Sequence, residues 1–124
     1  MITLKHLHYP RGPAPTGTPV LWRCEAKRYS YCIDPDMDRY GVTDPRLEMW
    51  WWEIDRATPK GAWVCGKFVL LTAIKRWACP TEEEALESFM ARKRKQIRIL
   101  STQLARAEAD LALAYPKTHA LVFA

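Results

Sequence analysis

The feature that most constrains the fold is a long stretch near the C-terminus without a helix breaker. After Pro80, neither glycine nor proline occurs until Pro116. Thr81 is followed three residues later by Glu84, which forms a capping box: the threonine hydroxyl accepts the Glu84 N–H, and the carboxylate reaches back to the Thr81 N–H. The sequence therefore predicts one helix over residues 82–114, with a length of about 50 Å at 1.5 Å per residue.

The residues before this helix carry the alternation of apolar and polar side chains that is typical of strands. The alternation changes phase near Lys27 and Arg28, which predicts a turn or a bulge there. Thr58-Pro59-Lys60-Gly61 fits a type I turn between two strands. The expected elements are a strand region over 20–33, a loop over 34–45, a hairpin of strands 46–57 and 62–72, and a last short strand over 73–79.

Together these elements predict an α+β fold: an antiparallel sheet of about four strands with one long C-terminal helix packed across it. The chain has 124 residues, which suits one domain. Prolines and glycines predict an extended or turn-rich arm over residues 1–19. The single domain is expected over residues 20–114, and an apolar tail over residues 115–124.

The charge balance favours an acidic partner. There are 19 Lys and Arg residues against 14 Asp and Glu residues, a net charge of +5, and nucleic acid is one such partner. No apolar run approaches the roughly 18 residues of a membrane-spanning helix. The N-terminus also lacks the apolar stretch of a signal peptide. We therefore expect a cytoplasmic protein with reduced cysteines and no membrane contact.

The sequence predicts neither a metal nor a cofactor. The four cysteines, none in C-x-x-C spacing, are expected to be small buried hydrophobes, and the alternative is a zinc site completed by His6 and His8. Asp34, Asp36 and Asp38 resemble the start of a calcium loop, but position six is Arg39 and position twelve is Pro45, where glycine and glutamate are required. The cysteines are Cys24, Cys32, Cys65 and Cys79.

No enzyme motif is found either. There is no glycine-rich phosphate loop, no G-x-S-x-G and no H-E-x-x-H. The three histidines, His6, His8 and His119, lie near the ends of the chain, where a general base is difficult to preorganise. We therefore predict a non-enzymatic protein without catalytic residues.

Three consecutive tryptophans indicate a binding surface. Neighbouring side chains of a strand point to opposite faces, so Trp50 and Trp52 share one face, and Trp51 shares the other with Met49. One face can pack under the helix, and the other then presents aromatic rings to a partner. The alternative is a sheet that is covered on both faces. The remaining aromatic residues assigned to the partner-binding surface are Tyr29, Tyr31 and Trp63.

The predicted helix carries the densest positive charge of the chain. Arg92-Lys93-Arg94-Lys95 is followed by Arg98, and on a helix Arg94 and Arg98 share a face, as do Arg92 and Lys95. This band is suited to phosphate contacts, or it is simply a solvated helix face. We assign Arg92, Arg94, Lys95 and Arg98 to the partner-binding surface.

The apolar residues of the helix follow the heptad spacing of a coiled-coil seam from residue 97 onward. A second copy of the helix can cover such a seam, which predicts a homodimer. The alternatives are that the tail Leu121-Val122-Phe123 folds back, or that the helix lies across its own sheet. The seam residues are Ile97, Leu100, Leu104 and Leu111, with Ala107 and Ala114 between and after them.

Residues 50–114 resemble a group of small uncharacterised accessory proteins encoded by tailed phages and prophages of Gram-negative bacteria. The resemblance covers about half the chain and implies no catalytic residues. It implies a setting in which small phage proteins bind host machinery, including CRISPR and other defence systems. The phrases that carry it are Thr58-Pro59-Lys60-Gly61-Ala62-Trp63, Ala78-Cys79-Pro80-Thr81, Glu84-Ala85-Leu86 and Ala91-Arg92-Lys93-Arg94-Lys95-Gln96-Ile97-Arg98-Ile99-Leu100.

The expected function is stoichiometric binding. The hypothesis is a phage accessory protein that occludes a host defence complex in the bacterial cytoplasm, in the manner of an anti-CRISPR inhibitor, and contacts a host protein or a protein–nucleic-acid complex. The alternative is direct nucleic-acid binding through the same basic and aromatic residues. The two differ in salt dependence, because phosphate contacts lose affinity steeply as salt rises.

Overall fold

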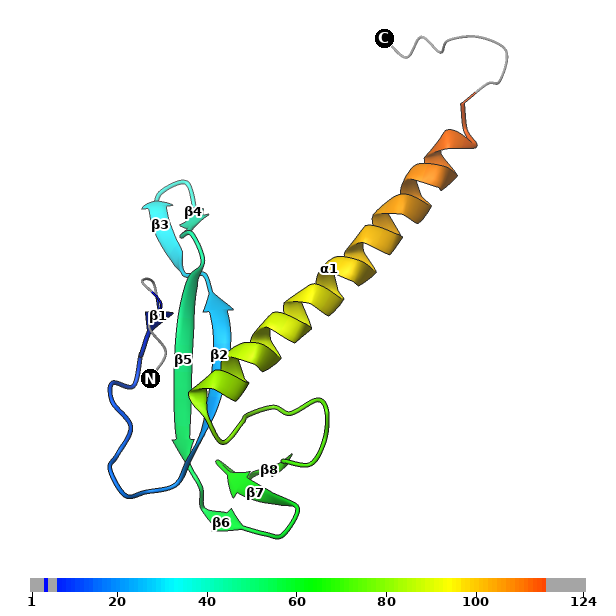
Figure 1. Cartoon of the computed structure of the whole chain (residues 1–124). Helices are drawn as coiled ribbons and strands as arrows, with labels where there is room; N and C mark the ends of the chain where they lie inside the picture. Colours follow the sequence, from blue (N-terminus) through cyan, green and yellow to red (C-terminus); the bar gives the residue numbers. More distant parts are fainter. Residues whose placement is uncertain (1–3, 5–6, 116–124) are drawn as a thin grey trace. The chain divides into compact units, whose positions relative to one another are not determined.

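The computed structural model describes residue 4 and residues 7–115 (Figure 1). The chain divides into two compact units, Met1–Met90 and Ala91–Ala124, which are considered separately. The elements are β1 (Leu7–His8), β2 (Val20–Lys27), β3 (Ser30–Asp34), β4 (Arg39–Val42), β5 (Arg46–Glu53), β6 (Arg56–Ala57), β7 (Gly61–Val64), β8 (Lys67–Leu70) and α1 (Glu82–Ala112).

The α+β class with one long C-terminal helix is confirmed, but the single sheet of about four strands is wrong. In the described residues the strands form three small sheets, with the orders β1-β5-β2, β3-β4 and β6-β7-β8. The pairing is mixed, because β1 runs parallel to β5 while the other pairs are antiparallel. Figure 1 shows the β3–β4 hairpin at one end of the long β2–β5 pair and β6–β8 at the other.

The predicted strand over 46–57 is in fact two strands in different sheets. Its first part, β5, pairs with β2, and its last residues, β6, pair with β7. Between them the Ile54 N–H donates to the Pro19 carbonyl at 3.0 Å, and the Asp55 N–H donates to the Trp63 carbonyl at 2.8 Å. These two bonds direct the chain from one sheet to the next. The predicted hairpin therefore exists only as β6–β7, around the turn in which the Thr58 N–H donates to the Gly61 carbonyl at 2.8 Å.

Three other local predictions have different outcomes. The phase change is confirmed as a break, since β2 ends at Lys27 and β3 begins at Ser30. The predicted loop over 34–45 is wrong in its middle, where β4 pairs with β3. The predicted strand over 73–79 is also wrong: the segment forms an isolated bridge in which Trp22 and Cys79 exchange two hydrogen bonds of 2.7 Å.

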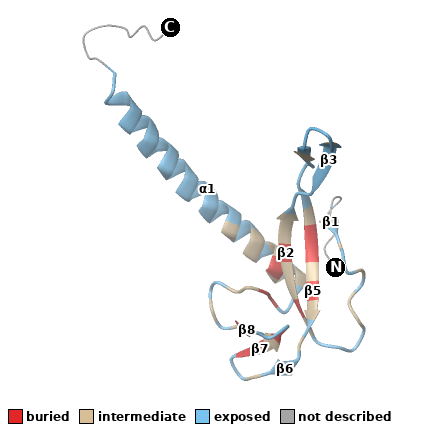
Figure 2. Cartoon of the chain, turned by 180° about the vertical axis from the view of Figure 1, so that it is seen from behind, coloured by how far each residue is buried: buried red, intermediate tan, exposed pale blue. Residues whose placement is uncertain are grey.

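The β2–β5 pair supports two buried clusters, one against each face (Figure 2). On one face Leu21 packs with the β7 and β8 residues Val64 and Val69, and Trp52 packs against this cluster. On the other face Met49 and Cys24 pack with Ala85 of the first turn of α1. The two clusters are separate because Met49 and Trp52, three residues apart on β5, point to opposite faces of the strand.

The helix begins at Glu82, as predicted. The Glu84 N–H donates to Thr81 Oγ1 at 3.2 Å, while the Glu84 carboxylate accepts from Arg76 at 3.1 Å. In α1 only Ala85 is fully buried, and every residue of 93–115 is exposed. Within the first unit the helix packs against the sheet through Ala85, in the cluster with Met49 and Cys24, and residues 91–112 belong to the second unit. The helix ends at Ala112, not at residue 114.

The described part of the N-terminal arm lies along the first unit. β1 adds a short parallel strand to β5. The Trp51 indole N–H donates to the Gly12 carbonyl at 3.1 Å, and the Arg11 guanidinium lies 4.4 Å from the centre of the Trp51 ring. These contacts hold the proline-rich arm against β5. The predicted tail over 115–124 lies outside the described residues, except for Tyr115.

Candidate interaction surfaces

One face of the β2–β5 pair carries charged and aromatic residues in register. We call it the ladder face. Antiparallel pairing places each β2 residue directly opposite one β5 residue, where the side chains are close enough to interact. The opposed pairs are Leu21 with Trp52, Arg23 with Trp50, Glu25 with Glu48, and Lys27 with Arg46.

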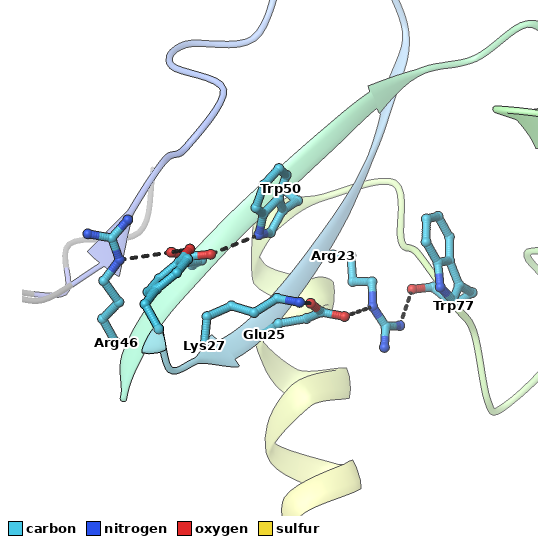
Figure 3. A network of polar contacts seen from close by, with 8 residues as sticks. Arg23, Glu25, Lys27, Arg46, Trp50 and Trp77 are labelled. Atoms are coloured by element: carbon cyan, nitrogen blue, oxygen red, sulfur yellow. Dashed lines mark hydrogen bonds and ion pairs between the residues drawn. The ribbon is translucent and has the colours of Figure 1, made fainter. Parts of the chain in front are cut away.

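The β2 side of the ladder face is a chain of ionic contacts (Figure 3). Arg23 Nε donates to Glu25 Oε1 at 2.6 Å, and Lys27 Nζ lies 3.0 Å from Glu25 Oε2. Arg23 Nη1 also donates to the Trp77 carbonyl at 2.6 Å, which ties the strand to the segment before α1. Burial would raise the pKa of Glu25, but the bonds from Arg23 and Lys27 outweigh it and hold that pKa below its ordinary value.

The β5 side contains the only fully buried charged residue among the described residues, Glu48. Its carboxylate accepts hydrogen bonds from the Tyr29 hydroxyl, from Arg46 Nε at 2.8 Å and from Trp50 Nε1 at 3.2 Å. Burial by itself would raise the pKa of Glu48. The bonds from Tyr29 and Arg46 have the larger combined effect, so the pKa of Glu48 is lowered. We call Glu48 and its three donors, Tyr29, Arg46 and Trp50, the Glu48 cage. Its hydrogen bonds favour the ionised form of the buried carboxylate.

This cage predicts an acid-sensitive contribution to stability. The folded pKa of Glu48 lies below the ordinary value of 4.5, so the unfolded chain takes up this proton first as the pH falls. The contribution is fully present at neutral pH and is lost as the pH falls from 4.5 through the folded pKa. Glu48→Gln should therefore be less stable than wild type at pH 7, and the difference should shrink below pH 4.5. Urea unfolding of both proteins between pH 3 and pH 7 measures this; a difference that is constant with pH would contradict it.

The two tryptophans predicted on one face of the strand, Trp50 and Trp52, lie in a row with Trp77. The ring centres of Trp50 and Trp52 lie 6.2 Å apart with an interplanar angle of 14°, and those of Trp52 and Trp77 lie 4.7 Å apart. Arg23 and Lys67 approach the face of Trp77, at 5.4 and 4.3 Å from its centre. All three rings are half-buried, so each has a covered part and an accessible part. Sequence reasoning missed Trp77, which is distant in the chain from the other two.

The structure does not gather the other predicted aromatic residues on this row. Trp63 belongs to the β6–β8 sheet, where it lies 5.3 Å from Phe68 and under the Arg56 guanidinium. Tyr29 follows β2 and joins the Glu48 cage. Tyr31 lies in the β3–β4 hairpin. The predicted platform is thus three separate aromatic groups.

The β3–β4 hairpin carries the largest set of exposed apolar side chains in the described part of the first unit. We call it the hairpin surface, and it has two faces: the register places Tyr31 opposite Gly41 on one face, and Tyr40 and Val42 opposite Cys32 and Ser30 on the other. An isolated two-stranded hairpin is only marginally stable in water, so apolar side chains left exposed on one are a sign of a contact surface. The ring of Tyr31 lies over Gly41, where an added Cβ would come within 2.5 Å of it. The exposed residues, each more than half accessible, are Tyr31, Ile33, Met37, Tyr40 and Val42.

Sequence reasoning missed this surface because it assigned residues 34–45 to a loop. Pro35, Asp36 and Asp38 do lie in the turn between β3 and β4, and Asp38 has the positive φ of 52° that such a turn requires. The signal that could have revealed the hairpin is the continued alternation of Tyr40 and Val42 after the turn. Those residues were too few to distinguish from a loop.

In the second unit, the predicted basic residues are mostly accessible. Arg94, Lys95 and Arg98 are exposed and Arg92 is half-buried, while Lys93 donates to Gln96 Oε1 at 3.1 Å. The seam residues are accessible as well: Ile97, Leu100, Leu104 and Leu111 have exposed fractions of 63, 53, 61 and 57%.

The cysteines are divided between two environments. Cys24 and Cys79 are buried, as expected, but Cys32 and Cys65 are exposed, which contradicts the expectation for those two. Cys65 lies in the two-residue β7–β8 turn, where its φ of 49° and the 73° of Gly66 define a type I′ hairpin. Within the described residues, no group of three or more His, Cys, Asp or Glu side chains is placed to hold a metal ion. His6 and His119 lie outside them.

Comparisons with known proteins identified no relative of this chain. No protein-family model matches the chain, and no significant match was found among curated proteins or solved structures. Over the described residues, no helix has both the length and the apolar character needed to cross a bilayer. The functional argument therefore depends on the surfaces described above.

Proposed function

We propose that this chain acts by stoichiometric binding to a protein partner, without chemistry of its own. The observation that carries the proposal is the hairpin surface, because a two-stranded hairpin that exposes large apolar side chains on both faces has the composition of an element that inserts into a partner. The neighbouring Tyr29 and Arg46, which stack at 5.1 Å, add an aromatic and a cationic group of the kind that dominates interfaces.

The resemblance of residues 50–114 to phage accessory proteins supports a more specific form of the proposal. In that form the partner is a host defence complex in the bacterial cytoplasm, such as a CRISPR effector, and binding occludes its working surface. The half-exposed tryptophan row, Trp50, Trp52 and Trp77, would then extend the contact beyond the hairpin surface.

The test compares matched serine substitutions in the first unit. Ile33 lies on the hairpin surface, whereas Ile74 is fully exposed in the segment before α1. Ile33→Ser with Tyr40→Ser should weaken binding to a partner captured from bacterial lysate at least tenfold, a loss typical of hot-spot residues. Ile74→Ser should bind like wild type. Equal binding by all variants, with unchanged circular dichroism, would remove the hairpin surface from the proposal.

A second candidate function is nucleic-acid binding, which the exposed Arg94, Lys95 and Arg98 favour. The same capture experiment with and without nuclease separates the two. A protein that remains after nuclease treatment supports protein binding. Capture that is lost with nuclease, and an affinity that falls steeply between 50 and 200 mM salt, would replace the first proposal with this one.

A further inference from the structure

We propose that the C-terminal half of α1 pairs with a second copy of itself in antiparallel orientation. The starting observation is the accessible seam Ile97, Leu100, Leu104, Ala107 and Leu111, whose leucines and isoleucine are all more than half exposed. Their spacing of 3, 4, 3 and 4 residues fixes the heptad: residues 97, 104 and 111 occupy a positions, and residues 100 and 107 occupy d positions. Nothing in this argument depends on what the first unit binds.

The distribution of charge along the helix disfavours a parallel pair. Between residues 92 and 98 the helix carries five cations and no anion, and between residues 106 and 110 it carries Arg106, Glu108 and Asp110, a net charge of −1. A parallel dimer places the five cations beside their own copies, which is repulsive. An antiparallel dimer places them beside the acidic end of the partner helix.

The sizes of the seam residues favour the same orientation. In a parallel pair each seam residue meets its own copy. Ala107 would then meet alanine, and two small side chains would leave the space between the helices poorly filled at that layer. In an antiparallel pair a positions meet d positions, and the register centred on residue 102 pairs Leu100 with Leu104 and Ile97 with Ala107 of the second copy. The Ile97–Ala107 layer then combines a large residue with a small one, the Leu100–Leu104 layer is filled by two leucines, and Leu111 packs along the aliphatic stem of Lys93.

This register also pairs the flanking positions by charge. Residues 94 and 108 both occupy e positions, and in the antiparallel register Arg94 of one helix lies beside Glu108 of the other, twice by symmetry. At the g positions the neutral Gln96 lies beside Asp110, where its amide can donate to the carboxylate. The structure thus assigns a self-complementary surface to one helix face, and the partner it fits is a second copy of this chain.

The first experiment asks whether the seam associates at all. Leu104 and Leu113 are both exposed leucines of the second unit, but only Leu104 lies on the seam. Sedimentation velocity over a wide range of protein concentration should show a monomer–dimer equilibrium for wild type and for Leu113→Asp. Leu104→Asp should remain monomeric. A wild-type protein that is monomeric at every concentration would overturn the proposal, as would equal dimerisation of both variants.

The second experiment tests the orientation by exchanging charges. Arg94→Glu alone and Glu108→Arg alone should each weaken dimerisation about tenfold, because each creates two like-charged pairs. The double variant should return to within about threefold of wild type. Only the antiparallel register predicts this restoration, so a double variant as weak as the single variants would contradict it.

The third experiment measures the orientation directly by cross-linking with a short bis-maleimide. The exposed Cys32 and Cys65 are first replaced by serine, to leave only buried native thiols in the described residues. Ser101→Cys should then cross-link to its own copy, because the two residues flank the centre of the antiparallel pair on the same side. Lys93→Cys should not, since the two copies would be separated by about 27 Å, which is 18 residues at 1.5 Å. Cross-linking of Lys93→Cys in place of Ser101→Cys would establish the parallel dimer instead.

Discussion

Replacing Glu48 by alanine should lower the free energy of unfolding by about 2 kcal/mol at pH 7. The carboxylate is completely buried and is the common acceptor for Tyr29, Arg46 and Trp50. Without it, these three donors lose their shared partner at a place that water reaches poorly. The penalty stays below that of a fully buried ion pair, because the Arg46 side chain is 46% exposed and can turn to solvent. Urea denaturation followed by tryptophan fluorescence measures the change.

The matched control is Glu25→Ala, directly opposite Glu48 in the β2–β5 register. Glu25 also has two cationic partners, Arg23 and Lys27, but its side chain is 27% exposed and those partners can be rehydrated. Its removal should cost no more than about 1 kcal/mol, as for other surface ion pairs. If both substitutions cost the same, burial of the carboxylate is not what stabilises the cage.

Local signals in the sequence predicted the ends of elements better than their partners. The helix start at Thr81 and a turn at Thr58–Gly61 are correct because each depends on residues within one turn of chain. Only half of the predicted capping box forms, since the Glu84 carboxylate accepts from Arg76 instead. The pairing of β5 with β2 joins residues 20–27 to residues 46–53, and no local pattern specifies that choice. The single predicted sheet failed for this reason, since the strand over 46–57 was extended through the break at Ile54 and Asp55.

The candidate surfaces were predicted in part for the same reason. Alternation correctly placed Trp50 and Trp52 on one face and Trp51 on the other. It carried no information on Trp77, which completes the row from a segment predicted as a strand, nor on Glu48, whose cage draws on Tyr29 from the turn after β2. Contacts between distant segments decide which aromatic rings are covered, and only the fold reveals them.

The seam on α1 is a case in which periodicity alone was sufficient to locate the residues. The 3.6-residue helix repeats its faces whatever it packs against, so the apolar positions from Ile97 to Leu111 could be read from the chain. Their exposure could not be predicted, because the sequence also allowed the helix to lie across its own sheet. The structure gives the four large seam residues exposed fractions above one half, and their pairing with a second copy stays a proposal.

The largest loss of stability is expected from Met49→Ala. Met49 has no exposed surface and lies on β5 in the cluster with Cys24, Cys79 and Ala85, where strand, bridge and helix meet. Truncation should lower the free energy of unfolding by about 3 kcal/mol, from lost apolar burial and the cavity that remains. Met37→Ala deletes the same atoms at a side chain that is 69% exposed on the hairpin surface, and should change stability by less than about 0.5 kcal/mol.

The contrast between the two methionines separates folding from binding. Met49→Ala should unfold at lower urea concentration while the protein that remains folded keeps its affinity for a partner, since Met49 is inaccessible. Met37→Ala should have wild-type stability and a weaker affinity if the hairpin surface is the contact. Comparable destabilisation by both would mean that the hairpin packs against the protein's own core in solution, and its apolar side chains would then be structural residues.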